Sequence, residues 1–169
     1  MREFTLGISG AAGTNGIALA VGQNTLNFVN PAAAPSVNIE FLRHWAGQSQ
    51  NATSAQQRIQ FVSQVTAFPT LTGATPAKLK RQDPNASVIV SGTAGAAGTS
   101  GVNASAEGGG AKTVIWDDFF NVLNGYLKVA TPAETEVFPA GSASGAGLWF
   151  PQTPGTLTGW GWGQNFREV

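Results

Sequence analysis

Residues 37–45 read Val-Asn-Ile-Glu-Phe-Leu-Arg-His-Trp, and an apolar side chain stands at every second position from Val37 through Ile39 to Phe41. Successive side chains of a β-strand point to opposite faces, so this period of two predicts a strand with one buried face. The β-branched and aromatic residues of the stretch favour the same structure. We therefore expect a strand that continues through His44 to Trp45.

The same alternation recurs along most of the chain, with Gly and Pro between the repeats. A strand that begins at Leu26 should end at Asn30-Pro31, because proline cannot donate to a ladder. Asn124-Gly125 suits a tight turn. For 54–65 a helix capped at Ser54 is the alternative to a strand. Further strands are expected at 4–8, 17–21, 59–65, 113–116, 119–129 and 157–169.

About eight short antiparallel strands separated by turns predict an all-β fold, a jelly-roll type β-sandwich, in a single domain spanning residues 1–169. One stretch interrupts this pattern: residues 91–111 are rich in Gly, Ala and Ser and lack apolar periodicity. Connections longer than about 15 residues are uncommon in compact domains, so we interpret 91–111 as a flexible loop or arm that leaves the core.

Two further segments bear on contacts with a partner. The segment 66–76 reads as a loop, yet it carries Phe68 and Leu71, which either fold back onto the sandwich or contact another subunit. In the last strand, Trp160 and Trp162 share one face and glycines occupy the other, which predicts a neighbouring backbone packed close to the glycine face. With Trp149, these tryptophans form either core or a sugar-binding platform.

The chain carries unusually little charge. Asp, Glu, Lys and Arg make up 11% of its 169 residues, whereas charged residues make up about a quarter of an ordinary soluble domain. Hydrophobic residues make up 42%. Nine basic and nine acidic residues give a net charge of zero. Such a surface has weak electrostatic protection against association, so we expect the chain to be held against other subunits. Scattered basic residues argue against nucleic acid as a partner.

No apolar stretch approaches the roughly 20 residues of a membrane helix, and Met1–Thr5 lacks a signal-peptide core. We therefore expect a soluble protein, made without a cleaved leader, that does not bind a membrane. There is no cysteine, and stability must come from packing.

The residues that could carry chemistry do not form a reactive set. His44 is the only histidine, so a zinc site of histidine and cysteine is not expected, and we predict that His44 faces outward from its strand. Asp117-Asp118 is an adjacent carboxylate pair, but neighbours on a strand point to opposite faces. Gly110-Ala111-Lys112-Thr113 departs from a phosphate-binding loop, and no Gly-x-Ser-x-Gly occurs. We predict no catalytic, cofactor-binding or metal-binding residue, and no enzyme activity.

Several short motifs carry a family resemblance: Ile39–Arg43 followed by Gln48–Arg58, Thr75–Leu79 leading to Asp83–Ser87, the Ala106-Glu107-Gly108 step, and the closing Phe166-Arg167-Glu168. Through them the chain resembles small structural proteins of tailed bacteriophages over most of its length. The resemblance implies a jelly-roll sandwich located at the capsid surface of a virion after synthesis in the host cytoplasm. It implies no catalytic residue, and the stretch 91–110 is longer than the pattern expects.

These observations predict a capsid decoration or cement protein that bridges capsomers and stabilises the phage head. Its expected partners are the major capsid protein and further copies of itself, as a closed homo-oligomer with a trimer as the first expectation. The alternative is a carbohydrate- or receptor-binding module on a tail or fibre. Besides the loop 91–111, the residues expected to contact partners are Met1, Arg2, Phe4, Phe68, Leu71, Trp149 and Trp160.

Overall fold

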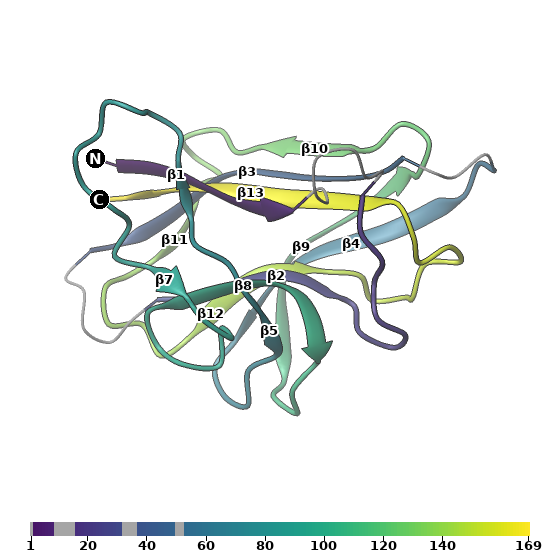
Figure 1. The fold of residues 1–169 in the computed structure, drawn as a ribbon, viewed down its shortest axis with the longest axis horizontal. Helices are drawn as coiled ribbons and strands as arrows, with labels where there is room; N and C mark the ends of the chain where they lie inside the picture. Colours follow the sequence, from purple (N-terminus) through teal and green to yellow (C-terminus); the bar gives the residue numbers. More distant parts are fainter. Residues whose placement is uncertain (1, 9–15, 32–36, 50–52) are drawn as a thin grey trace.

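The computed structural model describes residues 2–8, 16–31, 37–49 and 53–169. Over these residues the chain is all-β: thirteen strands and no helix, arranged in two sheets that pack face to face as a β-sandwich (Figure 1). The predicted fold class is confirmed at this level. All strand pairs are antiparallel except β7 with β8.

Sheet A is ordered β10-β3-β13-β1-β6, with β11 also pairing with β3. Sheet B is ordered β5-β8-β2-β12-β4-β9, with β7 beside β8. The strands of sheet A are β1 (Arg2–Ile8), β3 (Ile39–Gln48), β6 (Ala77–Lys78), β10 (Tyr126–Val129), β11 (Glu136–Phe138) and β13 (Trp160–Glu168). Those of sheet B are β2 (Thr25–Asn30), β4 (Gln56–Gln64), β5 (Thr70–Gly73), β7 (Val90–Ser91), β8 (Thr99–Ala106), β9 (Lys112–Asn121) and β12 (Gly145–Trp149).

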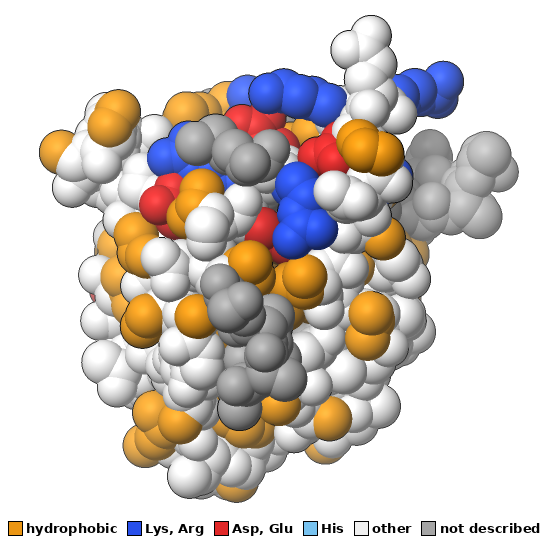
Figure 2. Space-filling view, turned by 90° about the vertical axis from the view of Figure 1, so that its left-hand side faces the viewer, with side chains coloured by type: hydrophobic (Ala, Val, Ile, Leu, Met, Phe, Trp, Pro, Cys, Tyr) orange, Lys and Arg blue, Asp and Glu red, His pale blue; other side chains and the backbone are white. Residues whose placement is uncertain are grey.

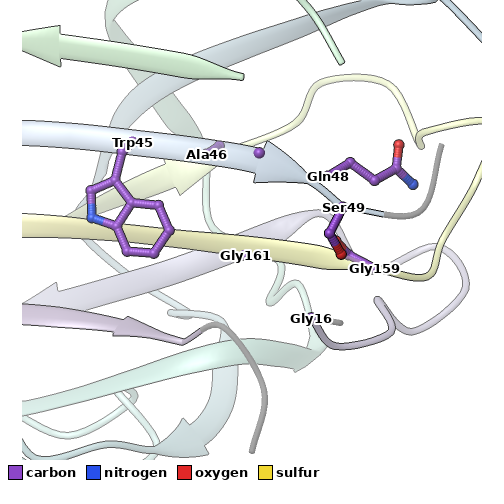
Figure 3. A pocket seen from close by; sticks show the side chains of 8 residues that line it. Gly16, Trp45, Ala46, Gln48, Ser49, Gly159 and Gly161 are labelled. Carbon is purple, nitrogen blue, oxygen red and sulfur yellow. The ribbon is translucent and has the colours of Figure 1, made fainter. Parts of the chain in front are cut away.

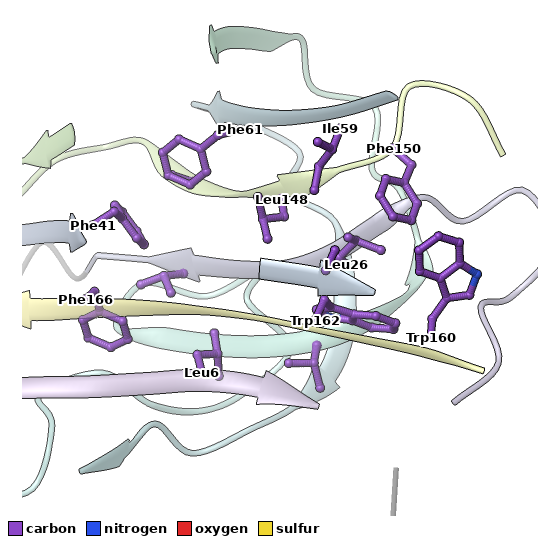
Figure 4. Close-up of a cluster of buried hydrophobic side chains, with 14 of the residues drawn as sticks. Leu6, Leu26, Phe41, Ile59, Phe61, Leu148, Phe150, Trp160, Trp162 and Phe166 are labelled. Carbon is purple, nitrogen blue, oxygen red and sulfur yellow. The ribbon is translucent and has the colours of Figure 1, made fainter. Parts of the chain in front are cut away.

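The core lies between the sheets and is rich in aromatic rings (Figure 4). Trp160, Trp162 and Phe166 of β13 share one face, as their alternation predicted, and all three face inward and are fully buried, so they belong to the core and not to a platform. Phe41 and Phe61 meet across the two sheets with their ring centroids 5.0 Å apart. Burying a side chain of this size contributes about 1.5–3 kcal/mol, so the aromatic pattern alone accounts for much of the driving force.

A β-bulge in β3 changes which of its residues face the core. In the pairing of β3 with β13, Asn165 lies opposite Arg43 but Phe166 lies opposite Phe41, so Leu42 is the extra residue. The inward positions therefore move from Ile39 and Phe41 to His44 and Ala46. The prediction that His44 faces outward is wrong, because the bulge turns it inward and leaves it 0% exposed.

The glycine-rich stretch 91–111 is part of the sandwich, and the prediction of an arm that leaves the core is wrong. It contains β8, which pairs with β2 on one side and β5 on the other. Ala94 and Ala104 pack with Phe28 and Leu71 in a second, smaller cluster that also contacts Phe68. Small residues are required here, since a Cβ on Gly101 would lie 2.8 Å from the Cβ of Leu71.

Two carboxylates tie the segment between β4 and β9 to the rest of the chain. Glu107 accepts hydrogen bonds from the backbone of Asn24 and from the backbone and hydroxyl of Thr25, where β2 begins. Glu168 in β13 accepts hydrogen bonds from Ser87 and Val88 and forms an ion pair with Arg2 at 2.9 Å. Charge-assisted bonds of this kind are stronger than neutral ones, so the long segment is anchored near its middle, at Ser87 and Val88, and near its end, at Glu107.

Several local predictions are also settled. β2 ends at Asn30, and residues 56–64 form a strand rather than a helix. The strand expected at 17–21 is wrong, because only Ile17 forms a bridge, with Trp160. The predicted glycine face is closely packed, but by two different groups: the backbone of Gly16 approaches Gly159 just before β13, whereas the indole of Trp45, a side chain, lies against Gly163.

Candidate functional site

Apolar side chains are exposed on the edge strands where the chain passes from sheet B to sheet A. β9 is an edge strand of sheet B, β10 and β11 lie at an edge of sheet A, and a tight turn joins β9 to β10. Seven of the twelve large apolar side chains that are exposed within the described residues lie on this segment. We call these residues the β9–β11 surface; they are Val114, Ile115, Phe119, Leu123, Leu127, Val129 and Val137.

Strand β10 turns its apolar side chains to solvent and its polar side chains inward, the opposite of an ordinary surface strand. Leu127 and Val129 point to solvent and are 63% and 56% exposed, whereas Tyr126 and Lys128 are partly buried. The Lys128 ammonium lies 5.1 Å from the centroid of the Trp116 ring, a cation–π arrangement that holds it toward the sandwich. A sheet with one free face normally presents polar residues to water, so outward Leu and Val make the surface of this strand unusually apolar.

The exposed edge of β9 is protected against pairing with another strand. Its pairing with β4 shifts between Phe61 and Val62, which marks a bulge, and two carboxylates stand at its centre. Asp117 forms an ion pair with Arg58, and Asp118 accepts a hydrogen bond from the backbone N–H of Phe119 at 2.7 Å. Bulges and charges on an edge prevent edge-to-edge association. Contact at this surface would therefore be made through side chains.

The pairing of β9 with β4 also places the adjacent carboxylates Asp117 and Asp118 on opposite faces of sheet B. Asp117 turns to the outer face of the sheet, where hydrogen bonding to Arg58 holds the pKa of the Asp117 carboxyl below its ordinary value. Asp118 belongs to the opposite face, on the side of Trp116 and Phe120, so the two carboxylates do not share a site.

A polar group is buried where β3, β10 and β11 meet. His44 Nε2 lies 4.0 Å from Glu136 Oε2, and the imidazole packs against the rings of Phe41, Phe61 and Trp116. Burial, with a smaller contribution from the Lys128 charge, lowers the pKa of His44 to about 3. Burial also raises the pKa of Glu136. His44 is therefore neutral near pH 7 and completely enclosed.

Charged side chains gather elsewhere. Ion pairs join β1 to β13 through Arg2 and Glu168, and β3 to β13 through Glu40 and Arg167. Figure 2 shows the charged side chains concentrated in the upper part of the end where the termini lie, whereas the remainder of that end is largely uncharged. Opposite charges paired within the chain leave little net field to attract an ionic partner.

The structure also locates the residues that the sequence singled out for partner contact; Met1 lies outside the described residues. Phe4 and Trp160 are 0% exposed and Leu71 is 3% exposed, so their side chains cannot reach a partner on the folded chain. Their apolar character reflects core packing, and as contact residues they are withdrawn.

The side chains of the other three candidates, Arg2, Phe68 and Trp149, are partly exposed. Arg2 forms an ion pair with Glu168, and Phe68 packs against the second cluster. Trp149 makes a cation–π contact with Lys112 of β9, whose Nζ lies 5.2 Å from the centroid of its ring. The β9–β11 surface was missed, although the dense apolar runs at 119–129 carried a signal: apolar residues occupy both faces there.

No family model matches the chain, and no curated protein or solved structure is similar to it. Among the described residues, no three His, Asp or Glu side chains come together to hold a metal ion. Nor does that part of the chain contain a helix long and apolar enough to cross a membrane. The site must therefore be argued from its own geometry.

Proposed function

We propose that this chain is a structural, non-enzymatic virion subunit: a capsid decoration or cement protein that associates with copies of itself and with the major capsid protein. The observation that carries the proposal is the β9–β11 surface, in which Leu127 and Val129 face solvent from a strand whose polar residues turn inward. The resemblance of the sequence to small structural proteins of tailed bacteriophages is the reason for proposing a location in the virion.

The strand order supports a jelly roll, the fold that the resemblance implies. When β6 and β11 are left out of sheet A, and β5, β7 and β8 out of sheet B, the remaining eight strands have the order β1-β13-β3-β10 in sheet A and β2-β12-β4-β9 in sheet B. The chain passes from one sheet to the other at nearly every connection, as in the double Greek key of a jelly roll. The segment between β4 and β9 adds β8 and β5 at the outer edge of sheet B. Jelly rolls recur in capsid and lectin domains, so the fold fits an assembly role without requiring one.

The mechanism is burial of apolar area. In a closed cyclic oligomer, with a trimer as the first expectation, every copy makes the same head-to-tail contact with its neighbour. Symmetry then multiplies a modest contact over many copies on a shell. Because the edge of β9 carries a bulge and two carboxylates, this assembly does not grow by strand addition at that edge.

We predict that the double variant Phe119→Ser/Leu127→Ser is monomeric, whereas the unaltered chain is a closed oligomer. Both side chains are more than half exposed, so their replacement removes apolar surface without opening the core. Molar mass from light scattering during size-exclusion chromatography measures the change. Val21→Ser is the matched control, since Val21 is 81% exposed in a turn outside the β9–β11 surface. A monomeric unaltered chain, or a double variant with unchanged mass, would contradict self-association.

We also expect the protein in purified virions in proportion to the major capsid protein. Quantitative mass spectrometry of the particles measures its copy number. Heads assembled with Phe119→Ser/Leu127→Ser should contain less of it than heads assembled with Val21→Ser. A handful of copies per particle would instead place it in the tail.

A further inference from the structure

Two adjoining hollows lie at one end of the sandwich and are lined entirely by uncharged residues. The first, about 340 Å³, lies on the outer face of sheet A and is bordered by Trp45, Gly47, Gln48 and Gly161 (Figure 3). The second, about 290 Å³, lies between the start of β4 and the loop before β13. Gln48 lines both, so together they form a continuous surface at this end.

Trp45 provides a flat platform beside the first hollow. A Cβ on Gly163 would lie 2.7 Å from the indole, and one on Gly7 would lie 3.2 Å from its Cζ2 atom. The ring therefore rests directly on glycine backbone, which no larger residue would permit. The side chain remains partly exposed. An indole supported in this way is held in place and offers apolar area at little cost in conformational entropy.

The amides around the hollows are also held in place. Gln48 donates from Nε2 to the carbonyl oxygens of Thr156, at 3.0 Å, and Thr158, at 2.8 Å. Gln57, which lines the second hollow, donates from Nε2 to the carbonyl oxygen of Gln152 at 2.9 Å. Side chains fixed by the protein lose less freedom when a ligand binds, which favours a specific site.

We infer that these hollows bind a neutral oligosaccharide, with one sugar ring against the Trp45 indole and the next beside Gln48. Among the described residues, no lysine, arginine, aspartate or glutamate lines either hollow, so none of them would offer an ionic ligand an opposite charge. A sugar ring combines an apolar C–H face, which packs on an aromatic ring, with hydroxyls that pair with amides and hydroxyls. Pockets of this kind use apolar area for affinity and a few fixed polar groups for orientation.

The inferred site differs from the platform that the sequence indicated. Trp160 and Trp162 are 0% exposed and unavailable for stacking, whereas Trp45 lies on the outer face. In the pairing of β10 with β3, Leu127 lies opposite Trp45, so the hollow adjoins the β9–β11 surface. The experiment must therefore separate sugar binding from subunit contact.

The test is binding of the full chain to an array of neutral and acidic glycans, followed by calorimetric titration with maltotriose, cellotriose and chitotriose. Trp45→Ala removes the platform. Gly47→Val fills the first hollow without strain, because a Cβ on Gly47 would meet only the Gly125 Cα, at 3.9 Å. Trp149→Ala is the matched control, a partly exposed tryptophan outside both hollows. Circular dichroism and light scattering verify that each variant keeps its fold and molar mass.

The unaltered chain should bind at least one neutral glycan, and both Trp45→Ala and Gly47→Val should weaken that binding by about ten-fold or more. Trp149→Ala should leave it unchanged. Failure to bind any neutral glycan, or binding that survives in both variants, would overturn the inference. So would a Trp45→Ala variant that loses only its oligomeric state, since that result would assign the indole to subunit contact.

Discussion

Replacing Phe61 by alanine should lower the free energy of unfolding by about 3–5 kcal/mol, a large loss for a single substitution. Phe61 is fully buried and lies at the centre of the aromatic cluster. Its ring centroid is 5.0 Å from that of Phe41, 4.6 Å from that of His44 and 5.9 Å from that of Trp116. Truncation therefore removes contacts with both sheets at once and leaves a cavity.

Chemical denaturation followed by tryptophan fluorescence measures this loss. Phe119→Ala is the matched control, because Phe119 lies on the adjacent strand β9 but is 62% exposed. Measured at a concentration where the chain is monomeric, the control should change stability by less than about 0.5 kcal/mol. Equal losses in the two variants would mean that the sandwich core is not organised around Phe61.

The second large effect is acid destabilisation through His44. Its pKa is about 3 in the folded chain and 6.5 for an exposed histidine. Above pH 6.5 the imidazole is neutral in both states and contributes no pH dependence. Between pH 6.5 and 3 the unfolded chain takes up a proton that the folded chain does not. Stability should therefore fall as pH falls through this range, by up to about 1.4 kcal/mol per pH unit.

Glu136 opposes this effect, because its raised pKa means that the folded chain takes up a proton at a higher pH than the unfolded chain. Denaturation midpoints measured from pH 7 to pH 4 test the prediction. His44→Phe and His44→Gln should both flatten the dependence on pH, whatever each does to stability at pH 7, since neither side chain titrates. A slope that is unchanged in both variants would show that His44 is not the group responsible.

Strand β3 shows where periodicity in the sequence is insufficient to assign the two faces of a strand. Alternation predicted the strand correctly, but it assigned His44 to the wrong face, because a single extra residue at Leu42 exchanges the two faces beyond it. The bulge depends on the register with β13, a strand about 120 residues away, and local periodicity carries no information about that pairing. The same limit applies to Phe4 and Leu71, whose exposure was inferred from their position near a terminus and in a loop.

The glycine-rich stretch illustrates a related limit. Low complexity over residues 91–111 indicated a flexible arm, yet β8 lies between β2 and β5 and contributes Ala94 and Ala104 to a buried cluster. Glycine and alanine are consistent with flexibility or with close packing. The close approach of Leu71 to Gly101 in the tertiary structure shows that this stretch is closely packed and not a flexible arm.

The sequence by itself determined the all-β class, the shared face of Trp160 and Trp162 in β13 and the low charge, because each follows from composition or from a period of two along one strand. Tertiary structure alone decided that His44 is enclosed, that Leu127 and Val129 lie uncovered on one side, and that Trp45 rests on glycines beside an uncharged hollow. These features arise where strands distant in the chain become neighbours, and the physical reason is that exposure depends on what packs against a residue.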